Sequence, residues 1–187
     1  MLNVQKATLD KMQKNAEIVT IAQALGLEIN EKTMKLKYEE DKLRYGKIII
    51  ASDADVDGAH IKNLFYTFIW NFCPELIIDG YVYGLVPPLY RIIMDKKTIY
   101  LKGDKELDEF KKEHPGKKYT VNRLKGLGEM SEDETTILVD PEQRIIKQIT
   151  VEDIKGADKV FEDLMGAATT PKKEFIKKNS HKAVNFI

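Results

Sequence analysis

Three aspartates that alternate along a short stretch, Asp53, Asp55 and Asp57, are the residues of this sequence best suited to chemistry. They follow an apolar run over residues 48–51, which is rich in isoleucine and predicts a buried parallel strand. Residues two apart on an extended segment project together at roughly 6–7 Å, which is close enough to share a hard cation. Because clustered carboxylates repel one another, the pattern predicts a compensating cation such as Mg²⁺.

Two other interpretations of this acidic segment compete with the cation site. An EF-hand loop also opens with Asp-x-Asp-x-Asp-Gly, but its twelfth position needs a glutamate, and this sequence has Leu64 there. A solvated turn in which Asp57 caps the following helix explains one aspartate and leaves the other two unexplained. The cation site is therefore the favoured interpretation.

The elements around the aspartates are predicted from the spacing of apolar residues. After Gly58, apolar residues three and four apart predict an amphipathic helix that Pro74 ends. A strand, an acidic turn and a helix place the acids where open α/β sheets bind ligands, outside the carboxyl ends of the strands. Elsewhere we expect two short helices within residues 5–25, the second capped by Asn15, and a linker or exposed helix over residues 30–42. Further strands are predicted at residues 81–86, 89–94, 98–101, 118–123 and 145–151, and further helices at residues 104–112, after Ser131, around residues 160–165 and from residue 170.

Residues 52–61, Ser-Asp-Ala-Asp-Val-Asp-Gly-Ala-His-Ile, resemble the metal motif of the Toprim domain in bacterial type II DNA topoisomerases. Other stretches resemble the B subunits of DNA gyrase or topoisomerase IV in order and spacing, at residues 2–4, 74–77, 80–83, 87–90, 125–130, 150–153 and 164–166. This resemblance spans essentially the whole chain. It implies an α/β fold with a Rossmann-like parallel sheet flanked by helices. It also implies a helical region with a linker over residues 1–45, a Toprim core over 46–140 and a helical carboxyl-terminal tail over 141–187.

The resemblance also implies a function, which is double-strand DNA cleavage and religation by a tyrosine on a partner subunit. Asp53, Asp55 and Asp57 would be the catalytic, metal-binding acids, with Mg²⁺ as the cofactor and Mn²⁺ or Ca²⁺ as possible substitutes. The expected DNA contacts are His60, Arg91 and Lys125, together with the loop glycines Gly126 and Gly128. The implied partners are double-stranded DNA, the breakage-reunion (A-type) subunit, and the ATPase and transducer part of the B subunit, where alone ATP would bind.

One departure from the family pattern concerns the start of the chain. In the family a catalytic glutamate precedes the Leu-Asn-Val stretch, whereas this chain begins with Met1 directly before Leu2. We therefore expect no activity from this chain alone, whether it is cut from a longer B subunit or is a naturally split subunit. Two alternatives stay open, which are another Toprim enzyme such as a nuclease or primase, and a structural subunit without catalysis.

Composition places further bounds on the function. The 187 residues carry 30 basic and 30 acidic side chains, so any DNA contact must come from local patches and not from net charge. The single Cys73 excludes an internal disulfide and suits a reducing cytoplasm. No stretch has the length and apolarity to span a membrane, so we expect a cytoplasmic protein associated with the nucleoid. The lysine-rich stretch over residues 172–178 is either a solvated helix face or a contact with DNA and the partner subunit.

Overall fold

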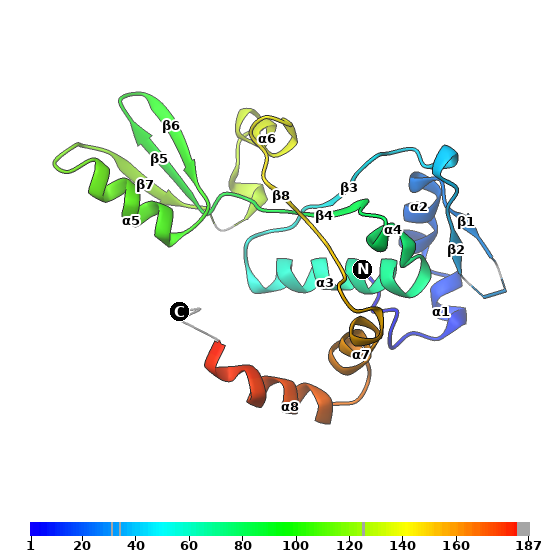
Figure 1. The fold of residues 1–187 in the computed structure, drawn as a ribbon. Coiled ribbons are helices and arrows are strands. Elements are labelled where there is room, and N and C mark those ends of the chain that lie inside the picture. Colours follow the sequence, from blue (N-terminus) through cyan, green and yellow to red (C-terminus); the bar gives the residue numbers. More distant parts are fainter. Residues whose placement is uncertain (31, 34, 125, 183–187) are drawn as a thin grey trace. The chain divides into compact units, whose positions relative to one another are not determined.

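The computed structural model describes residues 1–182 except residues 31, 34 and 125 (Figure 1). The chain forms two compact units that interleave along the sequence. The first unit contains residues 1–46, residues 64–80 and the chain from residue 150 onward, and the second contains residues 47–63 and 81–149. The division of the chain into three consecutive regions, residues 1–45, 46–140 and 141–187, stays a prediction.

The first unit is mainly helical. Its helices are α1 (Leu9–Gln13), α2 (Ala16–Leu25), the second part of α3 (Val56–Phe72), α4 (Glu75–Ile78), α7 (Ile154–Met165) and α8 (Thr170–Asn179), with 3-10 turns at Glu40–Lys42 and Ser180–Lys182. The sequence predicted the two amino-terminal helices. The Asn15 side chain accepts a hydrogen bond from the Ile18 amide, and Gly26 ends α2 with a φ of 79°.

The linker or exposed helix expected over residues 30–42 is partly wrong. Strands β1 (Glu28–Ile29) and β2 (Leu36–Lys37) pair there as a short antiparallel hairpin. Leu36 is buried and Lys37 is exposed, which is the alternation of a strand with one covered face. The expected charged segment therefore contributes a residue to the core of the first unit.

Helix α3 supplies the core of the first unit. Phe68, Ile69 and Trp70 are buried, and the α2 residue Ile18 is buried as well. Trp70 stacks on Phe161 of α7 with ring centroids 5.6 Å apart, and its indole N–H donates to the Asp158 carboxylate at 2.8 Å. The core packing expected of the apolar stripe around residues 160–165 is therefore found only in part, because Phe161 is half-buried against Trp70 whereas Val160 is exposed and no residue of α7 is fully buried.

The second unit holds two three-stranded sheets. The first has the order β3 (Ile48–Ile50), β4 (Val82–Leu85), β8 (Ile146–Gln148), in which β3 and β4 are parallel and β8 is antiparallel to β4. The second has the order β6 (Lys97–Leu101), β5 (Tyr90–Met94), β7 (Thr120–Arg123), and it is antiparallel throughout. Helices α5 (Asp104–Glu113) and α6 (Glu132–Val139), a 3-10 turn (Leu127–Glu129) and the start of α3 complete the unit. The expected α/β class is confirmed, with the parallel pairing between β3 and β4.

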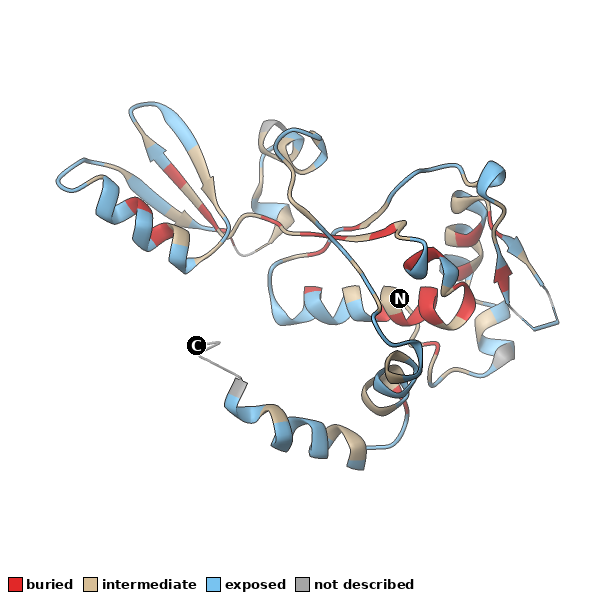
Figure 2. Cartoon of the chain, viewed as in Figure 1, coloured by how far each residue is buried: buried red, intermediate tan, exposed pale blue. Residues whose placement is uncertain are grey.

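Helix α5 covers one face of the antiparallel sheet, and buried residues lie on the faces of α5 and β5 that meet (Figure 2). The cluster contains Tyr90 and Ile92 of β5 with Leu107 and Phe110 of α5. The sequence predicted that Asp104 caps α5, but Asp104 is the first residue of the helix and accepts a hydrogen bond from the Tyr90 hydroxyl. Its carboxylate therefore ties the helix to the sheet.

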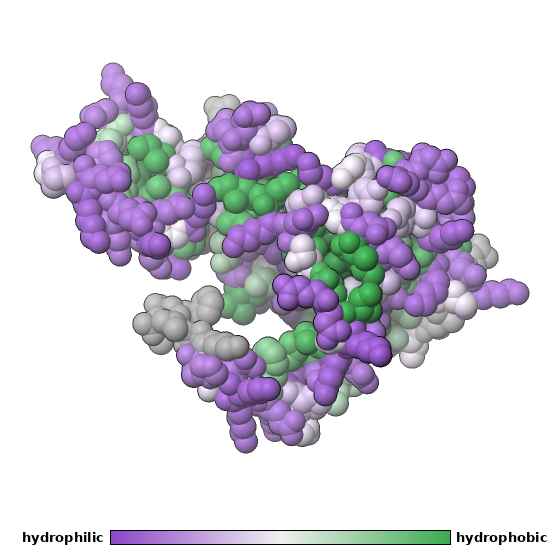
Figure 3. Space-filling view, viewed as in Figure 1, coloured by the Kyte–Doolittle hydropathy of each residue, from purple (hydrophilic) through white to green (hydrophobic). Residues whose placement is uncertain are grey.

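Helix α8 is the basic helix expected near the carboxyl end, and Pro171 lies in its first turn. Hydrophilic side chains cover much of its visible surface (Figure 3). Across the described part of the chain, no helix combines the length and the hydropathy that crossing a membrane requires.

Candidate metal and DNA site

Asp53 lies at the carboxyl end of the parallel pair, three residues after β3. It is half-buried, and its Oδ1 atom accepts a hydrogen bond from the Leu127 amide at 2.7 Å. The preceding Ser52 is buried, and its hydroxyl donates to the Gly58 carbonyl at 2.7 Å. Backbone groups on both sides of the acidic segment therefore fix the position of the Asp53 carboxylate.

Two glycines approach Asp53 closely, and of these Gly58 leaves no room for a side chain while Gly126 would require the carboxylate to move slightly. A Cβ atom on Gly126 would stand 3.0 Å from Asp53 Oδ2, and a Cβ atom on Gly58 would stand 2.2 Å from the Asp53 carbonyl oxygen. The Gly126 backbone thus lies close against the carboxylate, as expected for a glycine that permits close backbone approach. Gly128 is different, because no atom lies within 4 Å of the Cβ position there.

Asp55 begins helix α3. Its Oδ1 atom accepts a hydrogen bond from the Gly58 amide at 2.7 Å, and its carbonyl accepts from the Ala59 amide at 3.0 Å. This is the geometry of an N-cap residue, so Asp55 caps the helix, and not Asp57 as the competing solvated-turn interpretation required. Asp57 is instead an exposed residue in the first turn of α3.

The three aspartates were expected to project together from an extended segment, and this geometry is not found. Strand β3 ends at Ile50 and helix α3 begins at Val56, so the three acids lie on a loop, at a helix cap and on a helix. Within the residues that the structure describes, no three His, Cys, Asp or Glu side chains group closely enough to hold a metal. The assignment of all three acids to one ion stays a prediction.

Asp53 and Asp55 by themselves fit the chemistry of a Mg²⁺ site. Each uses one carboxylate oxygen to accept from a backbone amide, and no further hydrogen bond to a described residue engages the other oxygen. Mg²⁺ takes oxygen ligands, and one or two carboxylates with water and phosphate oxygens suffice to hold it.

Arg91, a predicted DNA contact, has a partner within the protein. Its guanidinium donates to Glu134 Oε1 at 2.6 Å, and the Tyr100 hydroxyl donates to the same oxygen at 2.9 Å. Ser131 and Glu134 form a capping box at the start of α6, the helix predicted after Ser131, and in it the Ser131 amide donates to Glu134 Oε2 at 2.7 Å. The Glu134 carboxylate therefore joins β5, β6 and the start of α6.

This network shifts the proton equilibria of its members. The hydrogen bond from Arg91, with further bonds from Ser131 and Tyr100, lowers the pKa of Glu134 to about 2. Burial, and then the hydrogen bond to Glu134, raises the pKa of Tyr100 to about 12. Glu134 is therefore a carboxylate and Tyr100 a neutral phenol at neutral pH.

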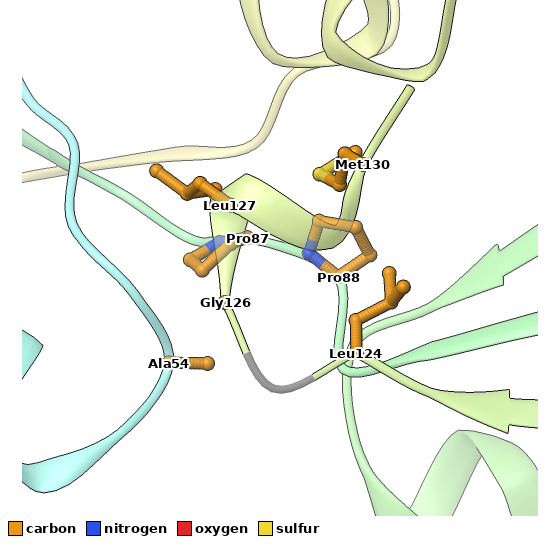
Figure 4. A pocket seen from close by; sticks show the side chains of 7 residues that line it. All are labelled: Ala54, Pro87, Pro88, Leu124, Gly126, Leu127 and Met130. Carbon is orange, nitrogen blue, oxygen red and sulfur yellow. The ribbon is translucent and has the colours of Figure 1, made fainter.

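Of the two other side chains predicted to contact DNA, His60 and Lys125, the structure describes only His60. His60 is exposed on α3, one turn beyond Asp57. Lys125 lies outside the described residues. Its neighbours Leu124, Gly126 and Leu127 line a small pocket with Ala54, Pro87, Pro88 and Met130 (Figure 4). The glycine loop thus lies beside the segment between Asp53 and Asp55.

Arg123, the last residue of β7, is not among the site residues predicted from the sequence. This arginine and Asp55 line a second pocket, of about 320 Å³, together with Ala54, Leu89 and Leu124. Its position at the end of a strand directly before the glycine loop was a signal in the sequence that could have identified it.

Comparison with known proteins matches two family models to this chain. One is the Toprim domain, over residues 2–83, and the other is "DNA gyrase B subunit, carboxyl terminus", over residues 116–177. The DNA gyrase B subunits of Mycoplasmoides gallisepticum and Thermotoga maritima are each 43% identical to this chain, and the alignments cover 99% and 97% of it. The Thermus thermophilus subunit is 44% identical over 98% of the chain. The chain spans 28–29% of the length of these relatives.

Proposed function

Because the chain belongs to the family of the Toprim and carboxyl-terminal region of DNA gyrase B subunits, we propose that it is the metal- and DNA-binding part of a type II DNA topoisomerase. In this role it supports Mg²⁺-dependent double-strand cleavage and religation, in which a tyrosine on an A-type subunit attacks the DNA. Its further partners are double-stranded DNA and the ATPase and transducer part of a B subunit, where ATP binds. It works beside the DNA in the cytoplasm.

The observation that carries this proposal is the pair of anchored carboxylates at the carboxyl end of the parallel strands. The Leu127 amide orients Asp53 and the Gly58 amide orients Asp55, so each acid is held before any ligand arrives. Such preorganisation costs no rearrangement during the reaction. The two acids are the residues of this chain that would hold Mg²⁺.

When bound there, the ion would supply positive charge against the negative charge that develops on the phosphate being cleaved. Asp57 supports the site from the first turn of α3, and His60 faces phosphate from the next turn. The amino end of a helix favours anions, because its amides and its dipole point toward them. Lys125, Gly126 and Gly128 bring the glycine loop to the DNA backbone. Arg91 forms an ion pair with Glu134, and this pair stabilises the same unit by joining β5 to α6.

The test is Asp53→Asn in an enzyme reconstituted with its A-type subunit and ATPase part. Asparagine keeps an acceptor for the Leu127 amide and removes the charge that the cation needs. We expect Mg²⁺-dependent DNA cleavage to fall by about 100-fold or more, as for loss of a group that stabilises transition-state charge, with assembly preserved. The matched control is Asp95→Asn at the tip of the β5–β6 hairpin, where φ is 51° and asparagine is well tolerated.

Intact cleavage in Asp53→Asn would contradict the proposal. The same variant distinguishes the proposed function from the alternative of a structural subunit without catalysis. A subunit that uses its acids only for folding would lose Mn²⁺ binding and thermal stability in Asp53→Asn, while cleavage by the assembled enzyme continued.

A further inference from the structure

The larger pocket of the second unit combines one acid and one base in otherwise apolar walls. Asp55 and Arg123 line it together with Ala54, Leu89 and Leu124. The Leu124 amide donates to the Leu89 carbonyl at 2.9 Å, which extends the β5–β7 ladder by one step beyond the Tyr90–Arg123 pair. Arg123 is therefore held on a regular strand at the edge of the pocket.

The two arginines of this antiparallel sheet differ in what they bind. Arg91 is half-buried and is engaged by Glu134 at 2.6 Å. Arg123 is exposed, and no hydrogen bond or ion pair between described residues engages its guanidinium. Asp104 and Asp108 of α5 raise the pKa of the Tyr90 hydroxyl and Arg123 lowers it, yet neither acid forms an ion pair with Arg123. The guanidinium is therefore available to an external anion.

The chemistry of the pocket selects the kind of anion. A guanidinium presents a planar fork of N–H donors that matches two phosphate oxygens. Asp55 repels a bare phosphate, so a phosphate in this pocket binds from the side of Arg123. A DNA backbone supplies such phosphates continuously, and the charge of the chain as a whole is zero, so attraction has to come from local cations of this kind.

We infer that Arg123 binds a phosphodiester of double-stranded DNA in the pocket beside Asp55, an inference that rests on the proposed function. The contact positions the DNA backbone relative to the anchored carboxylates. It reads no base sequence, because phosphates carry none. The contact between Arg123 and the phosphate needs no metal cation, whereas the proposed role of Asp53 and Asp55 is to bind one.

The experiment measures binding of the full chain to a fluorescein-labelled DNA duplex by anisotropy, in EDTA and over a series of NaCl concentrations. Arg123→Gln removes the guanidinium, and Arg44→Gln, at an exposed arginine of the first unit, is the matched control. We expect Arg123→Gln to weaken binding by about three- to tenfold and to reduce the slope of log K against log salt by about one. Arg44→Gln should match the wild type, and Arg123→Lys should restore the slope.

Each outcome decides the inference. Equal affinity and slope in Arg123→Gln and the wild type overturn it and leave the proposed function standing. A wild-type chain that does not bind the duplex overturns both. Arg123→Glu, measured in parallel, removes the same positive charge, so unchanged binding in whichever of the two variants folds also overturns the inference.

Discussion

The Leu127 amide donates a hydrogen bond of 2.7 Å to the Asp53 carboxylate, although the two residues lie 74 positions apart in the chain. Asp53 follows the parallel strand β3, and Leu127 opens the 3-10 turn after β7. This bond couples the orientation of the acid to the position of the glycine loop. Changes in the loop should therefore be felt at the proposed metal site.

Gly126→Ala tests this coupling. The new Cβ atom would stand 3.0 Å from Asp53 Oδ2, so the carboxylate must give way by a few tenths of an ångström and its bond to Leu127 must lengthen. We expect the affinity for Mn²⁺, measured by calorimetry, to fall by about tenfold, which corresponds to about 1.4 kcal/mol. The urea midpoint should change little, because the side chain that moves is free at one end.

Gly128→Ala is the control for this prediction, since it adds the same methyl group where no atom lies within 4 Å. It should bind Mn²⁺ as the wild type does. Equal losses in the two variants would mean that the loop acts through its flexibility and not through contact with Asp53.

Gly58→Ala should destabilise the protein, although alanine in a helix usually adds up to about 1 kcal/mol over glycine. Its Cβ atom would stand 2.2 Å from the Asp53 carbonyl oxygen, and backbone atoms cannot yield as a side-chain end can. We expect a loss of about 1–3 kcal/mol in the free energy of unfolding by urea. Gly46→Ala, with open space at the Cβ position, should leave that value nearly unchanged, and a stabilised Gly58→Ala would refute the close approach.

Elements with a local signal were predictable from the sequence. Asn15 and Gly26 bound α2 because a cap and a left-handed residue act within one turn. The turn at Asp95 and Lys96, between the strands predicted at residues 89–94 and 98–101, has positive φ at both residues, which is typical of two-residue hairpins. The capping box at Ser131 is equally local.

The geometry of the acidic segment was only partly predictable. Alternating side chains share a face only while the chain stays extended, and here the extension ends at Ile50. Asp55 is then the N-cap of helix α3, and one of its carboxylate oxygens accepts a hydrogen bond from the Gly58 amide. The pairing of Arg91 with Glu134 joins residues 43 positions apart, and a single sequence carries no local signal for such a contact.

Asp55 has two roles that can be separated by substitution. Asparagine keeps the side-chain oxygen that accepts from the Gly58 amide, whereas alanine removes it. We expect Asp55→Ala to lose about 1 kcal/mol of stability and Asp55→Asn to lose only a few tenths. Both should lose Mn²⁺ affinity, because neither has a charged ligand. Undiminished Mn²⁺ binding in Asp55→Asn would leave the residue with a capping role alone.

Glu134→Gln should destabilise the second unit. Glutamine keeps one acceptor oxygen and replaces the other with an NH2 group, which only donates, so either the Arg91 guanidinium or the Ser131 amide loses its acceptor. Loss of a charge-assisted hydrogen bond at a largely covered position costs about 1.5–3 kcal/mol. Glu132→Gln, at an exposed position on the same helix, removes the same charge and should cost little in urea denaturation. Equal values for the two variants would contradict the role assigned to Glu134.

The stabilisation by Glu134 should also depend on pH in a defined direction. Its pKa in the folded protein is lowered to about 2 from an ordinary value of 4.5, mainly by Arg91, so the carboxylate stabilises the fold fully above about pH 5. The contribution is lost as the pH falls toward 2. The difference in unfolding free energy between the wild type and Glu134→Gln should therefore narrow steadily below pH 4.5. A difference that stays constant between pH 7 and pH 3 would show that the charge of Glu134 contributes nothing to stability.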